Sequence, residues 1–281
     1  MTAILLALSS AVAYGLSDFV GGVSSKKASP WSVALVAQLA GGVVVLGLTT
    51  VLDGSPTDID LAWAVVVGAA NGIGTGFLYR GLSSGRMGVV APVSGVGAAL
   101  VPVAVGLITG ERPSALVWLG IAAALPGIWL VARTTEPQDL GGDRPRTGGV
   151  LDGVLAGLGF GVLFAALAQI PESAGFLPLA LNQLVAAAVV VTMAMALRAA
   201  WVPRQPAAAF GAVSGVLGAT ATGAFLLATQ SGFLTVTAVL ASLYPAVTVM
   251  LAATILREHI HRGQAAGLVL CGLAVALVVG G

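Results

Sequence analysis

The sequence predicts an all-α membrane protein in which ten transmembrane helices form two inverted repeats of five helices each. Three observations carry this prediction. Hydrophobic residues make up 58% of the 281 residues and charged residues only 8%, whereas a soluble domain has about 25% charged residues. The apolar residues fall into ten long runs. The last five runs repeat the pattern of the first five.

Each apolar run is long enough to cross a bilayer, which takes about 20 predominantly apolar residues in a helix. The runs are apolar on all sides, whereas the strands of a membrane β-barrel alternate in polarity. In the first half, the predicted spans are 2–22, 32–52, 61–82, 87–109 and 115–132. After a polar stretch, the second half has predicted spans at 149–169, 176–198, 207–228, 233–256 and 263–280.

An internal repeat relates the two halves. When they are superposed, Glu111 aligns with Glu258 and Gly120 with Gly267. Because each half has an odd number of spans, the second half enters the membrane in the opposite direction. Inverted repeats around a central site are a recurrent plan of secondary transporters. The expected organisation is a first repeat over 1–132, a linker over 133–148 and a second repeat over 149–281.

Glycines four residues apart recur along the predicted helices. This spacing lets helix backbones approach closely in lipid, where hydrophobic burial cannot drive association. We therefore expect a tightly packed bundle. The sets are Gly68/Gly72/Gly76, Gly81/Gly85, Gly106/Gly110, Gly153/Gly157/Gly161, Gly211/Gly215 and Gly263/Gly267.

Basic residues are concentrated on the loops that follow odd-numbered spans. Of the 12 basic residues, only Arg112 lies on an even-numbered loop. The positive-inside rule therefore predicts that the odd-numbered loops are cytoplasmic and that both termini lie outside. The residues on the odd-numbered loops are Lys26, Lys27, Arg80, Arg86, Arg133, Arg144, Arg146, Arg198, Arg204, Arg257 and Arg262.

Three segments resemble the drug/metabolite transporter superfamily, specifically its ten-helix members with two EamA domains. They read AYGLSDFVGGVSSKKASP in the first span, APVSGVGAALVPVAVGLITGERPS in the fourth and SLYPAVTVMLAATILREHI in the ninth. The resemblance covers the whole chain, although Arg257-Glu258-His259 stands where Gly-Glu-Arg is usual. It implies movement of small metabolites, amino acids or drugs, driven by an ion or concentration gradient. It also implies cytoplasmic termini, the reverse of the charge pattern, so both orientations stay open.

Asp18 is the only acid deep inside a predicted span. A carboxylate there costs at least about 2.5–3.5 kcal/mol on insertion scales, so it should face the bundle interior or a water-filled cavity. One interpretation is a proton-coupling or cation-binding group. The other is a local ion pair with Lys26 or Arg86. The apolar run ends soon after Asp18, which places it in the outer third of the helix.

Glu111 and Glu258 end equivalent helices of the two repeats. The neighbouring Arg112 and Arg257 favour ion pairs that maintain the fold, and a gating salt bridge is the alternative.

Prolines interrupt the same two helices: Pro92 and Pro102 in the fourth span, and Pro245 in the ninth. Paired interruptions of equivalent helices point to the binding site and to hinges. Kinks without a role in transport are the alternative.

Uncharged polar residues inside the spans either bond a neighbouring helix or line a cavity. Asn71 and Tyr244, beside Gly72 and Pro245, are the best cavity candidates, and Ser94 is a further candidate for substrate contact. We expect the cavity near the third, fourth, eighth and ninth spans. The other such residues are Ser17, Gln38, Thr75, Gln169, Asn182, Gln183, Ser214, Thr220, Thr222 and Ser242.

The sequence lacks a G-x-x-x-x-G-K-[ST] loop, which excludes ATP hydrolysis by that route. Its buried ionisable groups are too few for an active site, so we expect no enzyme activity. Two histidines, His259 and His261, do not make a metal site, and no cofactor is expected. The net charge of +1 argues against a nucleic-acid partner.

The predicted function is therefore a secondary transporter in the cell membrane, working as an exporter by alternating access. No lysine or arginine lies deep in a span, which favours neutral, zwitterionic or hydrophobic substrates, such as an amino acid, over phosphate esters. Protons or another ion are candidates for coupling. The sequence specifies no oligomer, and a monomer is compatible with it. A channel or facilitator without ion coupling is the alternative, which two inverted halves in one chain suit less well.

Overall fold

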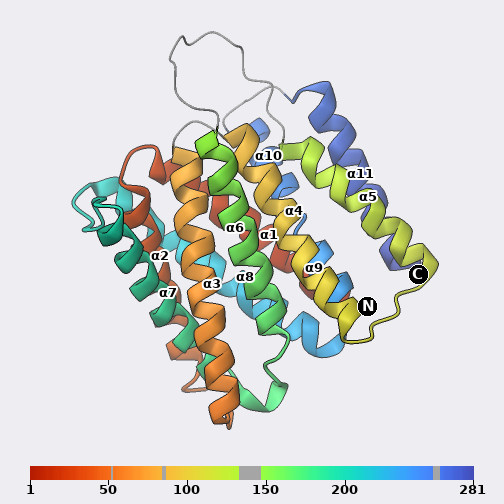
Figure 1. The fold of residues 1–281 in the computed structure, drawn as a ribbon, viewed down its shortest axis with the longest axis horizontal. Helices are drawn as coiled ribbons and strands as arrows, with labels where there is room; N and C mark the ends of the chain where they lie inside the picture. The colour runs from red at the N-terminus through yellow and green to blue at the C-terminus, as the bar shows by residue number, and fades with distance from the viewer. Residues whose placement is uncertain (52, 84–86, 133–146, 256–259) are drawn as a thin grey trace.

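The chain folds into a bundle of long helices (Figure 1). The structure, a computed structural model, describes residues 1–51, 53–83, 87–132, 147–255 and 260–281. Eight helical segments are long and apolar enough to cross a bilayer, and the shorter apolar helices Val93–Ile108 and Ala115–Val131 bring the number of spans to ten. The described residues contain no strand. The predicted all-α membrane fold is confirmed.

The helices follow the predicted spans closely. In the first repeat they are α1 (Thr2–Ser25), α2 (Pro30–Leu48), α3 (Asp58–Ser83), α4 (Met87–Ile108) and α5 (Ala115–Ala132). In the second repeat they are α6 (Thr147–Leu167), α7 (Leu177–Ala196), α8 (Gly211–Ser231), α9 (Leu234–Ala241), α10 (Tyr244–Ile255) and α11 (Arg262–Gly280), with short 3-10 turns η1 (Glu172–Ala174) and η2 (Pro206–Phe210). Most of the predicted linker, Glu258, and the arginines at 86, 133, 144, 146 and 257 lie outside the described residues.

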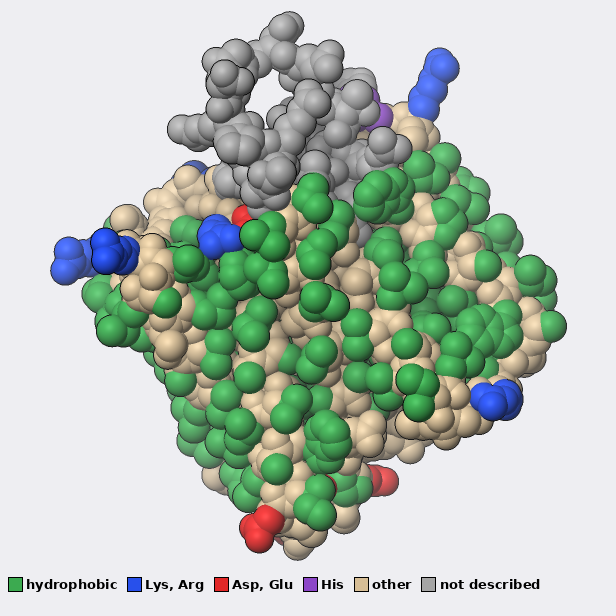
Figure 2. Space-filling model, viewed as in Figure 1, with side chains coloured by type: hydrophobic (Ala, Val, Ile, Leu, Met, Phe, Trp, Pro, Cys, Tyr) green, Lys and Arg blue, Asp and Glu red, His purple; other side chains and the backbone are tan. Residues whose placement is uncertain are grey.

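The two ends of the bundle differ in charge. In Figure 2 hydrophobic side chains cover the middle of the visible face, while basic side chains gather mostly at the upper end and acidic ones mostly at the lower end. The carboxyl ends of α1 and α3 lie at the basic end, and both chain termini lie toward the other end (Figure 1). The structure thus has the predicted charge asymmetry, whereas the absolute orientation stays a prediction.

The contacts between helices come in pairs, because each contact has a counterpart in which the equivalent helices of the other repeat take part. α1 packs along α8, and its counterpart α6 packs along α3. In the same way α2 contacts α8 and α3 contacts α7, while α5 packs along its own counterpart, α11. Each repeat therefore inserts its first helix against the other repeat. This interlocking matches the predicted inverted repeat.

Glycines bring several helices to backbone contact, as expected from their spacing. A Cβ added to Gly97 of α4 would lie 2.8 Å from Cα of Gly157 on α6. One added to Gly215 of α8 would lie 2.0 Å from the carbonyl oxygen of Ala37 on α2. Gly263 is an exception, since an added Cβ there meets no atom within 4 Å.

The predicted ninth span, 233–256, is divided into α9 and α10 by a turn at Ser242 and Leu243. Pro245 lies just after this turn and has no N–H to bond the preceding helical turn. In contrast, α4 continues through Pro92 and Pro102, so the predicted interruption of the fourth span is wrong. α4 packs closely along α6. In a membrane, neighbouring helices can satisfy the backbone groups that a proline leaves without a hydrogen bond, so the helix continues.

Candidate functional site

A cavity lies inside the bundle, between helices of both repeats. It has about 530 Å³ of empty space, counting the part open to solvent. The wall is built by α1, α2 and α3 of the first repeat and by α6, α7, α8 and α10 of the second. The lining residues are Tyr14, Ser17, Asp18, Ala37, Gln38, Asn71, Thr75, Tyr79, Phe160, Phe164, Gln183, Gly215, Gly218, Thr222 and Tyr244.

The predicted cavity is thus only partly right in its helices. The third and eighth spans and α10 of the ninth do line it, as expected. The described residues of α4 do not, and Ser94 is fully buried behind the wall. The cavity is also lined by α1, where Asp18 was already a candidate, and by α2, α6 and α7, because hydropathy does not reveal which helices face the centre.

One side of the cavity is a cluster of amide side chains centred on Asn71. Asn71 Nδ2 lies 3.1 Å from both Asn182 Oδ1 and Gln183 Oε1, and 3.3 Å from Gln38 Oε1. A side-chain amide has two N–H groups, so Asn71 serves two of these three acceptors at a time. Thr75 donates to Asn71 Oδ1 at 3.1 Å. The cluster therefore joins α2, α3 and α7 while exposing polar atoms to the cavity.

Tyrosine hydroxyls in the cavity are fixed by neighbouring helices. Tyr14 bonds Thr222 Oγ1 at 2.9 Å, and Thr222 also donates to the carbonyl of Gly218. Because Thr222 has one proton, Tyr14 is the donor in their shared bond. Tyr244 bonds Ser94 at 2.9 Å, which gives Ser94 a positioning role.

Tyr79 reaches across to α8, where its hydroxyl bonds Ser214 Oγ. Ser214 also donates to the carbonyl of Ser17, and Ser17 donates to the carbonyl of Ser214. These reciprocal bonds hold α1 against α8 beside the cavity.

Aromatic rings from α1, α6 and α10 form another part of the cavity lining, here called the aromatic wall. The ring of Tyr14 lies 5.7 Å from that of Phe164 and 6.3 Å from that of Tyr244. The Phe160 ring lies 6.5 Å from that of Tyr244, edge to face. These separations fall within the 4.5–7 Å typical of attractive aromatic pairs.

Asp18 lines the same cavity. It follows Tyr14 by one helical turn, so both side chains lie on the same face of α1. Its side chain is partly buried and lines the cavity. Within the described part of the chain its carboxylate has neither a hydrogen bond nor an ion pair, and the predicted pair with Lys26 is not formed. The other predicted partner, Arg86, is outside the described residues.

Glu111 holds the start of α9. Its Oε1 accepts the backbone N–H of Leu234 at 2.6 Å, and its Oε2 accepts the N–H of Thr235 at 2.9 Å and the Thr235 hydroxyl. The predicted ion pair with Arg112 is not formed. Arg112 instead donates to backbone carbonyls, including that of Glu111 at 2.8 Å. A carboxylate at a helix N-terminus is stabilised by unpaired N–H groups and by the helix dipole.

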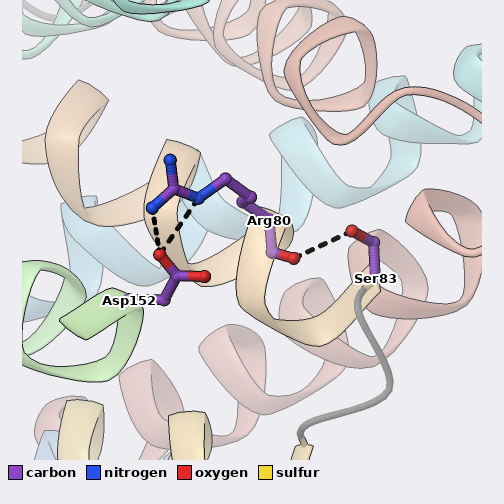
Figure 3. A network of polar contacts seen from close by, with 3 residues as sticks. All are labelled: Arg80, Ser83 and Asp152. Atoms are coloured by element: carbon purple, nitrogen blue, oxygen red, sulfur yellow. Dashed lines mark hydrogen bonds and ion pairs between the residues drawn. The ribbon is translucent and has the colours of Figure 1, made fainter. Parts of the chain in front are cut away.

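Sequence reasoning missed an ion pair between the repeats (Figure 3). Arg80 near the end of α3 donates through Nε to Asp152 Oδ1 of α6 at 3.0 Å, and its guanidinium lies 4.4 Å from the centre of the Phe77 ring. Ser83 donates to the carbonyl of Arg80. Both charged residues fall within predicted spans, so pairing was the arrangement to expect in a membrane.

Two repeats that enclose a polar and aromatic cavity form a multi-pass membrane protein, and the family match identifies it as a transporter of the drug/metabolite type. The chain belongs to the EamA-like transporter family, whose model matches residues 1–133 and 147–280. A solved structure described only as "Crystal structure of protein" has a TM-score of 0.71 and 18% sequence identity, and the match covers 98% of this chain and 95% of that chain. This likeness supports the fold. No curated protein sequence matches the chain.

Proposed function

We propose that the protein is a secondary transporter that exports a small metabolite or drug-like molecule across the cell membrane by alternating access. The observation that supports this most directly is the cavity, whose wall is built by both repeats. Motion of elements from the two repeats about a shared site would expose that site to each side in turn. In this proposal Asp18, Asn71 and Tyr244 contact the substrate, and the break before Pro245 is a hinge.

The cavity wall also limits the substrate. None of the described residues that line the cavity is Lys, Arg or His, so a phosphate group would find no charged partner among them. The proposed substrate therefore carries no phosphate.

Filling the cavity tests this function. Gly218 lines the cavity, and Gly47 on α2 has open space around it. Substrates would first be found by thermal stabilisation of the purified protein and then followed in proteoliposomes. We expect saturable uptake with counterflow, abolished by Gly218→Leu and unchanged by Gly47→Leu. Normal uptake by a folded Gly218→Leu variant would rule out this cavity as the route.

A channel or uncoupled facilitator is the alternative. Because inverted repeats suit alternating access, we expect no unitary currents in planar bilayers and a flux that saturates with concentration. Single-channel currents or a linear flux would instead favour the channel.

The proposed orientation places the odd-numbered loops in the cytoplasm. It predicts that a cysteine at Arg204 is labelled only in opened membranes, whereas one at Asp53 is labelled in intact cells. Both positions are exposed, while the native Cys271 is buried. The reverse labelling pattern would invert the orientation.

A further inference from the structure

We propose that the substrate is an organic cation, an amine or quaternary ammonium compound with an apolar body, whose nitrogen binds Asp18 beside the aromatic wall. This inference rests on the proposed function, because it assigns a substrate class to the same cavity. The sequence favours neutral, zwitterionic or hydrophobic molecules, whereas this inference favours molecules that combine a net positive charge with an apolar body.

The first argument is that Asp18 has no hydrogen-bond or ion-pair partner among the described residues. Tyr14 and Tyr79 line the same cavity as Asp18, yet both hydroxyls donate to hydroxyls on α8. Ser17, its neighbour in the chain, donates to α8 as well. Within the described residues no group donates to the carboxylate. A partly buried carboxylate without a partner is costly, and a bound cation would supply the missing interaction.

The second argument is the aromatic wall. Tyr14, Phe160, Phe164 and Tyr244 line the same cavity as Asp18. A cation within about 6 Å of an aromatic ring centre is attracted by the ring, and the attraction grows when the site is desolvated. Hydrophobic substituents on the nitrogen would also gain contact with these rings. A carboxylate beside aromatic rings is therefore suited to an alkylated or arylalkyl ammonium group.

The third argument separates a cation from a zwitterion. Among the described residues, the lining contains one carboxylate and no cationic side chain. The ammonium of an amino acid would pair with Asp18, but its own carboxylate would be buried without a counter-charge, which is unfavourable. An amine that lacks the carboxylate avoids this cost.

A set of four probes with one phenylethyl body tests this inference. They are 2-phenylethylamine, its N,N,N-trimethyl derivative, zwitterionic phenylalanine and neutral 2-phenylethanol. Binding is measured by isothermal calorimetry and by thermal stabilisation of the full-length protein in lipid nanodiscs. We expect the two cations to bind at least about tenfold more tightly than phenylalanine or phenylethanol, since a hydrogen bond or contact with a charged group contributes more than a neutral one.

Asp18→Asn is the decisive variant, because it removes the charge while keeping the size of the side chain. We expect it to weaken binding of both cations at least about tenfold and to leave phenylethanol unchanged. Asp53→Asn, the same change at an exposed aspartate, should bind all four probes like the native protein. Phe160→Leu should weaken cation binding several-fold without removing a hydrogen bond.

Equal cation binding by native and Asp18→Asn protein would overturn the inference, as would phenylalanine or phenylethanol binding as tightly as the amine. Proteoliposome flux separates this result from the proposed function. Asp18-dependent cation binding without flux would support the substrate-class assignment and contradict the transporter. Saturable flux of a neutral solute, without cation binding, would support the transporter and contradict the organic cation.

Discussion

The carboxylate of Glu111 makes the stability of α9 sensitive to one atom. In Glu111→Gln, an NH₂ group replaces one of the two oxygens that accept backbone N–H groups from Leu234 and Thr235. At least one of these N–H groups then loses its acceptor, at a cost of about 1–3 kcal/mol. Loss of the negative charge at the helix N-terminus adds about 0.3–1 kcal/mol. Because Glu111 is partly exposed, we expect a total loss of stability in the lower half of the combined range, about 2 kcal/mol.

Thermal unfolding in nanodiscs, followed by circular dichroism or intrinsic fluorescence, measures this effect. A loss of about 2 kcal/mol corresponds to a fall of about 4–8 °C in the unfolding midpoint for a chain of this size class. The matched control is Glu172→Gln, since Glu172 is exposed and its side chain makes no hydrogen bond among the described residues. A double-mutant cycle with Thr235→Val should give a coupling above about 0.5 kcal/mol. If Glu111→Gln has the same unfolding midpoint as Glu172→Gln and the native protein, the capping role is refuted.

Three further substitutions probe the packing and polar contacts. Gly215→Ala places a Cβ 2.0 Å from the Ala37 carbonyl oxygen and should prevent α2 from packing on α8, which would be seen as a loss of monodisperse protein. The control Gly47→Ala meets open space and should stabilise the protein by about 0.5–1 kcal/mol. A well-folded Gly215→Ala variant would contradict the backbone contact. Asp152→Asn should lower the free energy of unfolding by about 1 kcal/mol. The value is modest because solvent screens Arg80, whose side chain is 31% exposed. An unchanged midpoint of thermal unfolding would show that the ion pair contributes nothing. Asn71→Leu removes the shared partner of three neighbouring amides, so it should lower the free energy of unfolding by about 2–3 kcal/mol and reduce uptake in proteoliposomes. If the variant is as stable as the native protein, these amides find other partners.

Hydropathy was sufficient to predict the helical membrane fold, because a bilayer requires long apolar helices. It did not predict the exchange of α1 and α6 between the repeats, since the apolar surface of a span does not distinguish lipid from protein. Proline was an uncertain guide to helix breaks. The chain turns before Pro245, yet α4 runs through Pro102, and neighbouring contacts rather than proline itself decide between the two outcomes.

Polarity within the spans indicated part of the cavity. Asp18, Asn71 and Tyr244 do line it, since a polar group in a membrane helix favours the interior. The role of Glu111 was not predictable from its neighbours, because its donors are main-chain groups at the start of α9. Asp152 was visible in the sequence, and its pairing with Arg80 could have been inferred from the position of both residues within spans.

The exchange of helices between the repeats also bears on how the protein is made. α1 is synthesised first, but α8, the helix that packs along it and bonds Ser17, is among the last to leave the ribosome. At about 5–20 residues per second, the 197 residues that separate Ser17 from Ser214 take roughly 10–40 seconds to synthesise. During that time Ser17 and Asp18 lack their native neighbours on α8. The native pairing of α1 is therefore a late event in biogenesis.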